Sequence, residues 1–153
     1  MSKLKEVTSN QILEAMHSYK IVINQIETIR KELNDAHAGT AQYGLQASMP
    51  KASGTSDVLF SEYLRRERMH KTLDRMKEKV TIIQMFCESS EFDRLAFKDK
   101  LILEYTLLGM SQTEIGDKEE IDCGRSNVLK RQRAISKSIA TAYKRNLETL
   151  ETK

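Results

Sequence analysis

Hydrophobic positions recur every three or four residues along two long stretches of this chain. In residues 8–36 the apolar stripe consists of Ile12, Met16, Tyr19, Ile23, Ile26 and Leu33. From about Val58 to Cys87 it consists of Met69, Leu73, Met76, Val80, Ile83 and Cys87. Such spacing places each set on one face of an α-helix. The pattern predicts two long amphipathic helices, packed as a hairpin, as part of a bundle or as a coiled coil.

The helical pattern lapses between these two stretches. Residues 37–57, HAGTAQYGLQASMPKASGTSD, hold three of the six glycines, the single proline and several Ser and Thr residues. Gly and Pro punctuate regular structure, so we predict a loop over 37–57. A loop of this length inside a compact domain is usually functional or mobile.

Shorter apolar segments follow Ser89-Ser90-Glu91, which we interpret as a hinge. Helices are expected at about 93–108, 112–118 and 125–148, with the final LETLETK frayed. Aromatic residues make up 6% of the chain, and turn residues do not recur as they would in a sandwich or barrel. We therefore predict an all-α protein with a helical N-terminal region, 1–90, and a C-terminal domain, 91–153.

The segment from Phe97 to Ile139 has the outline of a helix-turn-helix. Gly109 suits the end of the first helix, where a left-handed backbone is inexpensive for glycine. Ser111 and Glu114 form an S-x-x-E capping box that would open a short second helix. Gly124 is an acceptable N-cap for the last helix. The residues expected to fill the space between these helices are Leu101, Tyr105, Leu108, Ile115, Ile121 and Cys123. Gly116 lies where a small residue would let two helices approach closely.

Charge is polarised at this end of the chain. The segment 125–147 has seven Lys and Arg residues and no acid, whereas 114–122 contains five acids. At 100° per residue, one face of the last helix carries Val128, Gln132, Ile135 and Ile139. The opposite face carries Ser126, Lys130, Arg133 and Lys137. A cationic helix whose end fits the major groove is typical of proteins that read duplex DNA.

We therefore expect this last helix to bind double-stranded DNA. Arg125, Ser126 and Asn127 would reach base edges, because Arg suits guanine and Asn suits adenine. The remaining cations, Lys130, Arg131, Arg133 and Lys137, would bind phosphates or nearby base edges. Exposed amides at Ser111, Gln112 and Thr113 would take a phosphate oxygen.

No pattern for catalysis, metal binding or membrane insertion is found in the sequence. The three histidines lie on different predicted elements, and neither a phosphate-binding glycine loop nor a nucleophile motif occurs. Cys87 and Cys123 have no partners at metal-ligand spacing, which is typical of reduced cytosolic thiols. No stretch approaches the ~20 apolar residues of a membrane span. We expect a cytoplasmic protein that is not an enzyme and needs no cofactor or metal.

Two sets of motifs resemble known families. GMSQTEIG at 109–116 and GRSNVLKRQRAI at 124–135 resemble region 4 of sigma-70 factors, in which the helix at the second motif enters the major groove. The loop AQYGLQASMPKASGTSD at 41–57, with YLRRERM at 63–69, resembles the RinA and ArpU group of late-gene transcriptional regulators from phages of Gram-positive bacteria. Val58 departs from the proline expected after Ser-Asp.

The second resemblance implies a transcriptional activator of phage late genes, acting in the cytoplasm of the bacterial host. It would bind upstream DNA and the host RNA polymerase. Two other interpretations stay open: a small-terminase-like subunit that recognises DNA for packaging, and a helical module that binds an acidic protein. The sequence also leaves open whether the two long helices pack across a homodimer.

Overall fold

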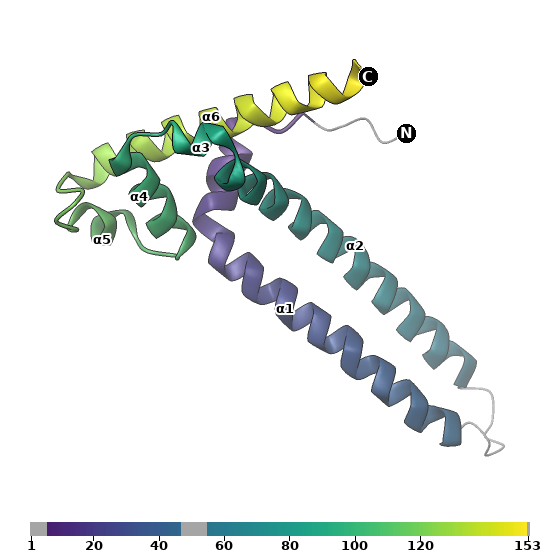
Figure 1. Ribbon diagram of the computed structural model, residues 1–153. Helices are drawn as coiled ribbons and strands as arrows, with labels where there is room; N and C mark the ends of the chain where they lie inside the picture. The colour runs from purple at the N-terminus through teal and green to yellow at the C-terminus, as the bar shows by residue number, and fades with distance from the viewer. Residues whose placement is uncertain (1–5, 47–54, 153) are drawn as a thin grey trace. The chain divides into compact units, whose positions relative to one another are not determined.

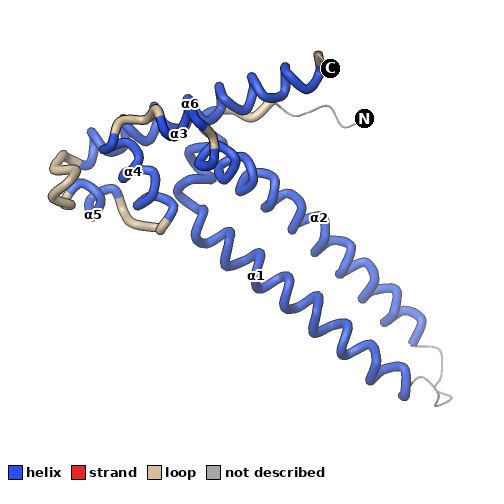
Figure 2. The backbone as a smooth tube through the Cα atoms, viewed as in Figure 1, coloured by secondary structure: helices blue, strands red, loops and turns tan. Residues whose placement is uncertain are grey.

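The computed structural model describes the backbone of residues 6–46 and 55–152, and the side chains of residues 6–35 and 58–152. Within these residues the chain is helical and has no strand, so the all-α prediction is confirmed (Figure 1, Figure 2). The elements are α1 (Ser9–Gln46), α2 (Thr55–Glu88), α3 (Ser90–Asp93), α4 (Phe97–Leu107), α5 (Gln112–Gly116) and α6 (Arg125–Glu151).

Helix α1 begins where a reciprocal pair of hydrogen bonds satisfies its first amides. The hydroxyl of Thr8 accepts from the amide of Gln11 at 3.3 Å, and the side-chain oxygen of Gln11 accepts from the amide of Thr8 at 3.2 Å. This arrangement is a capping box. Thr8 is therefore the N-cap of α1.

The predicted loop over 37–57 is wrong at both of its ends. Helix α1 continues through residues 37–46, and α2 already begins at Thr55. Each glycine in a helix costs only about 1 kcal/mol relative to alanine, and the residues around Gly39 and Gly44 include Ala, Gln and Leu. A long helix that is already nucleated tolerates that cost. The central part of the predicted loop, residues 47–54, lies outside the described residues.

The later helices differ from their predicted limits. The helix expected at 93–108 spans only Phe97–Leu107, because the short α3 and a turn at residues 94–95 precede it. That turn lets Phe92 and Leu95 pack against the core. The chain bends at Ser89, within the segment that we interpret as a hinge. Helix α6 runs to Glu151, three residues beyond its predicted end, since the final segment holds no helix breaker.

The chain divides into two compact units, which we describe separately. The hairpin unit, Ile23–Lys77, pairs the second part of α1 with the first part of α2. Ile26 and Leu73 are buried in it, each 5% exposed. Its outer surface carries ion pairs along α2, including the Glu67–Lys71 pair at 3.4 Å. Such exposed pairs contribute little to stability, because water and salt screen the charges.

The head unit contains the described residues up to Val22 and from Glu78 onward. Its core takes apolar side chains from the start of α1, the end of α2 and helices α4 to α6: Ile12, Met16, Ile82, Ile83, Phe86, Ile102, Leu103, Ile115, Ile121, Val128, Ile135 and Ile139. The unit that carries α6 therefore differs from the 91–153 domain expected from sequence. The first residues of α1 and the last residues of α2 complete its core.

Candidate nucleic-acid interface

Helix α4 ends in a Schellman motif at Gly109. The Gly109 amide donates to the carbonyl of Thr106 at 3.0 Å, and the Met110 amide donates to the carbonyl of Tyr105 at 3.1 Å. Gly109 has φ +86°, in the left-handed region that the sequence predicted for this position. Its open Cα faces the aliphatic part of Lys20. The turn therefore needs glycine both for its backbone and for its contact with α1.

Helix α5 begins with the predicted capping box. The Ser111 hydroxyl accepts from the Glu114 amide at 3.3 Å, and the Glu114 carboxylate accepts from the Ser111 amide at 2.8 Å. These hydrogen bonds hold the pKa of Glu114 below its usual value. The carboxylate occupies the end of α5 that was expected to bind a phosphate through Ser111, Gln112 and Thr113. A phosphate at the Ser111 amide would have to displace it.

The turn from α5 to α6 is packed on its inner side and acidic on its outer side. A Cβ at Gly116 would collide with the backbone carbonyl of Cys123, which confirms that a small residue is required. Ile121 is fully buried and its carbonyl accepts from Lys98 Nζ at 3.2 Å. Asp122 reverses the chain with φ +41°. The exposed acids of this turn are Asp117, Glu119, Glu120 and Asp122.

One predicted packing position is wrong. Leu108 was expected to face the core, but it is 61% exposed. Helix α4 stops at Leu107, so Leu108 lies in the turn and its side chain leaves the helical face. The buried face of α4 consists of Ile102, Leu103 and Thr106. Leu101 and Tyr105 are half-buried at its edge.

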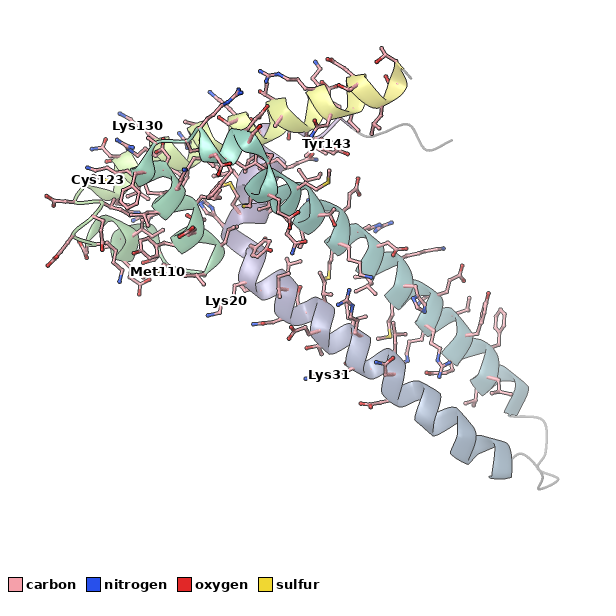
Figure 3. All side chains as sticks on the ribbon, in the orientation of Figure 1. Lys20, Lys31, Met110, Cys123, Lys130 and Tyr143 are labelled. Atoms are coloured by element: carbon pink, nitrogen blue, oxygen red, sulfur yellow. The ribbon has the colours of Figure 1, made fainter. Side chains whose placement is uncertain are left out.

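The two faces of α6 are as predicted. Val128, Gln132, Ile135 and Ile139 are buried, together with Ser136 and Ala142. Ser126, Lys130, Arg133 and Lys137 are exposed along the other side. Figure 3 shows Lys130 on the first turns of α6 and Cys123 on the preceding turn. Because no acid occupies the first turn of α6, the positive end of its dipole is not neutralised.

A buried amide, Gln132, connects four helices of the head unit. The Thr106 hydroxyl donates to the carbonyl of Ile102 at 2.6 Å, so its oxygen is left to accept from Gln132 Nε2 at 2.8 Å. This fixes the orientation of the Gln132 amide. Its Oε1 then faces two donors: His17 Nε2 at 3.0 Å and Gln112 Nε2 at 3.1 Å.

The same hydrogen bonds orient Arg125 at the start of α6. Since Gln112 directs its Nε2 to Gln132, its Oε1 is available to accept from Arg125 Nε at 3.3 Å. The guanidinium keeps its two terminal nitrogens for another partner. No sequence pattern indicated that His17 or Thr106 belongs to this network. A polar Gln132 on an otherwise apolar helical face was the one available clue.

The predicted site residues fall into two groups. Ser126, Asn127, Lys130, Arg133 and Lys137 are exposed on α6, and Thr113 is exposed on α5. The others have partners within the head unit: Ser111 caps α5, Gln112 and Arg125 join the buried network, and Arg131 Nη1 forms a 3.0 Å ion pair with Asp99. A phosphate at Arg131 would compete with that carboxylate.

An open groove of about 640 Å³ lies beside the start of α6, lined by His17, Met110, Gln112, Thr113, Arg125 and Gln132 among others.

In the described part of the chain, no three His, Cys, Asp or Glu side chains are placed to hold a metal ion. None of its helices is long and apolar enough to cross a membrane. Burial raises the pKa of the Cys87 thiol, which disfavours the reactive thiolate.

Comparison of this chain with known protein families, characterised proteins and solved structures finds no match.

Proposed function

We propose that this protein is a sequence-specific DNA-binding transcriptional activator that reads the major groove with the start of α6. The observation that supports this most directly is the exposed stripe Ser126, Lys130, Arg133 and Lys137. No ion pair joins its three cations to any described residue. Cations without acidic partners can release the counterions of a phosphate backbone at little cost to the protein.

The opposite face of α6 supports the same proposal. Six of its residues, between Val128 and Ala142, are buried in the head unit, so this part of the helix is held while its cationic face stays open to solvent. Ser126 to Lys137 span about 16 Å at 1.5 Å per residue, a length that fits within one passage of the major groove. Asn127 and the oriented Arg125 lie at the leading end, where side chains reach base edges.

The acidic turn limits where DNA can lie. Glu119, Glu120 and Asp122 are exposed and would repel phosphates that came near them. We therefore assign the contacts with DNA phosphates to Lys130, Arg133 and Lys137, which lie away from the turn. The resemblance to the RinA and ArpU group favours late phage genes as the target and host RNA polymerase as a further partner.

The test is fluorescence anisotropy with a duplex selected from a random pool, measured over a salt series. The logarithm of affinity should fall with the logarithm of salt by about 0.9 per phosphate contact. Replacing both Lys130 and Arg133 with Ala should reduce the slope by about 1.8 for two lost contacts. Lys31→Ala, an exposed cation on α1, is the matched control and should leave the slope unchanged.

Base reading is tested separately. Asn127→Ala should cost about 1–3 kcal/mol on the selected duplex and much less on random DNA. An equal loss on both would mean that Asn127 touches only the backbone. No binding to any duplex at low salt would favour the protein-interaction alternative. Activation of a reporter promoter without packaging proteins separates an activator from a small-terminase-like subunit.

A further inference from the structure

Helix α6 continues beyond the part of it that the core buries. Ala142 is its last buried residue, yet the helix runs nine residues further, to Glu151. Tyr143 and Leu147 are half-buried and Leu150 is 69% exposed. Their spacing of four and three places them on one helical face. We call these three residues the C-terminal stripe; Figure 3 shows Tyr143 at its beginning.

The C-terminal stripe borders a groove of about 640 Å³ between the end of α6 and the segment before α1. Val7, Ala140, Tyr143 and Leu147 supply its apolar surface. Lys144 and Glu151 line it as well, one turn to either side of Leu147. Along α6 the charged lining changes sign, from Lys137 and Lys144 to Glu148 and Glu151, and Glu6 contributes a further acid from the segment before α1. A second helix that presents the reverse order of charges is complementary to this mixed polar and apolar groove.

We propose that a second copy of this chain docks here, with the two α6 helices antiparallel about a two-fold axis near Leu147. In that arrangement position 144 faces position 150 of the second copy, so Lys144 lies beside the second copy's Glu151. The symmetry repeats the pair on the other side of the axis. The same symmetry places Tyr143 and Leu150 of opposite copies together. A parallel pairing would instead bring equal charges together.

This interface leaves the start of α6 open for DNA, from Arg125 to Arg133, although Lys137 lines the edge of the groove. Leu147 follows Arg133 by 14 residues, which corresponds to about 21 Å along the helix. The stripe is small beside the roughly 800 Å² per partner of a stable complex, so the dimer should be weak and concentration-dependent. This dimer also differs from one that pairs through the two long helices, because every residue of the proposed interface belongs to the head unit.

Sedimentation velocity of the full chain without DNA tests the proposal over a wide concentration range. The mass should rise with concentration from 17.6 kDa toward twice that value. Leu150→Glu should abolish the rise without unfolding the helix, because the side chain is already exposed. Leu59→Glu, which is 61% exposed on α2, is the matched control and should dimerise normally.

Charge reversal tests the antiparallel register. Lys144→Glu and Glu151→Lys should each weaken the dimer, and the double variant Lys144→Glu/Glu151→Lys should restore it. Circular dichroism checks that each variant keeps its helix content. Three results would overturn the proposal: a constant 17.6 kDa mass at all concentrations, a dimer lost in Leu59→Glu but not in Leu150→Glu, or a double variant no stronger than the singles.

Discussion

The buried contact between Thr106 and Gln132 offers the sharpest test of how the head unit is held together. Thr106 is 2% exposed and Gln132 is fully buried, and a 2.8 Å hydrogen bond joins them. Thr106→Val keeps the volume but removes the acceptor, which leaves the Gln132 amide with a buried, unpaired N–H. A buried hydrogen-bond donor without an acceptor lowers the free energy of unfolding by about 1–3 kcal/mol.

Gln132→Leu should cost less than Thr106→Val. It removes the acceptor of His17 and Gln112, but His17 is exposed and Gln112 is half-buried, so both can turn to water. We expect a loss near the lower end of the same range, about 1 kcal/mol. The double variant removes donor and acceptor together. Because an apolar pair of similar shape leaves no buried polar group without a hydrogen bond, the double variant should be more stable than Thr106→Val alone.

Urea unfolding of the wild type, the two single variants and the double variant completes the cycle. The coupling free energy should lie at about 1–2 kcal/mol, within the range seen for residues in direct contact. The dependence of the unfolding free energy on urea concentration should be the same in all four proteins. Equal slopes would show that each protein exposes the same surface area on unfolding. If the two single effects simply add, the hydrogen bond does not hold the amide as described, and the orientation of Gln112 and Arg125 loses its basis.

Two further predictions concern α5. Gly116→Ala should destabilise the head unit by about 1–3 kcal/mol, because its methyl group would meet the rigid backbone carbonyl of Cys123; urea unfolding that matches the wild type would contradict this. The lowered pKa of Glu114 means that its folded state favours the carboxylate. Its stabilising contribution should be complete above the ordinary carboxyl pKa and lost as pH falls through the lowered value. The difference in urea midpoint between wild type and Glu114→Ala should therefore shrink toward acid pH, and a constant difference would count against the capping box as its source.

Local signals explain why several features of α4 to α6 were predictable. The left-handed turn at Gly109 and the capping box of Ser111 and Glu114 each depend on residues within one turn of chain. The same holds for the buried and exposed faces of α6, which follow from the helical period. Gly116 is a partial case, since the sequence indicated a close approach but not that the Cys123 carbonyl makes it.

Three features were missed or misplaced, two at the ends of helices and one at a contact with a distant residue. The loop expected over 37–57 failed where residues 37–46 continue α1, because the cost of two glycines is small beside the stability of a long helix. Leu108 fits the apolar spacing, yet the helix ends one residue before it. Arg131 belongs to the cationic face by sequence, but Asp99, 32 residues earlier, pairs with it.

The sequence by itself determined the all-α class, the caps of the short helices and the cationic face of α6. Each of these arises from backbone geometry and from neighbours a few residues apart. Tertiary structure alone decided that the ends of the two long helices complete the core around α6. It also decided that His17, Thr106 and Gln112 converge on Gln132. Such contacts join residues up to 115 positions apart, and no local pattern in the chain specifies which of its polar side chains will meet once the core has formed.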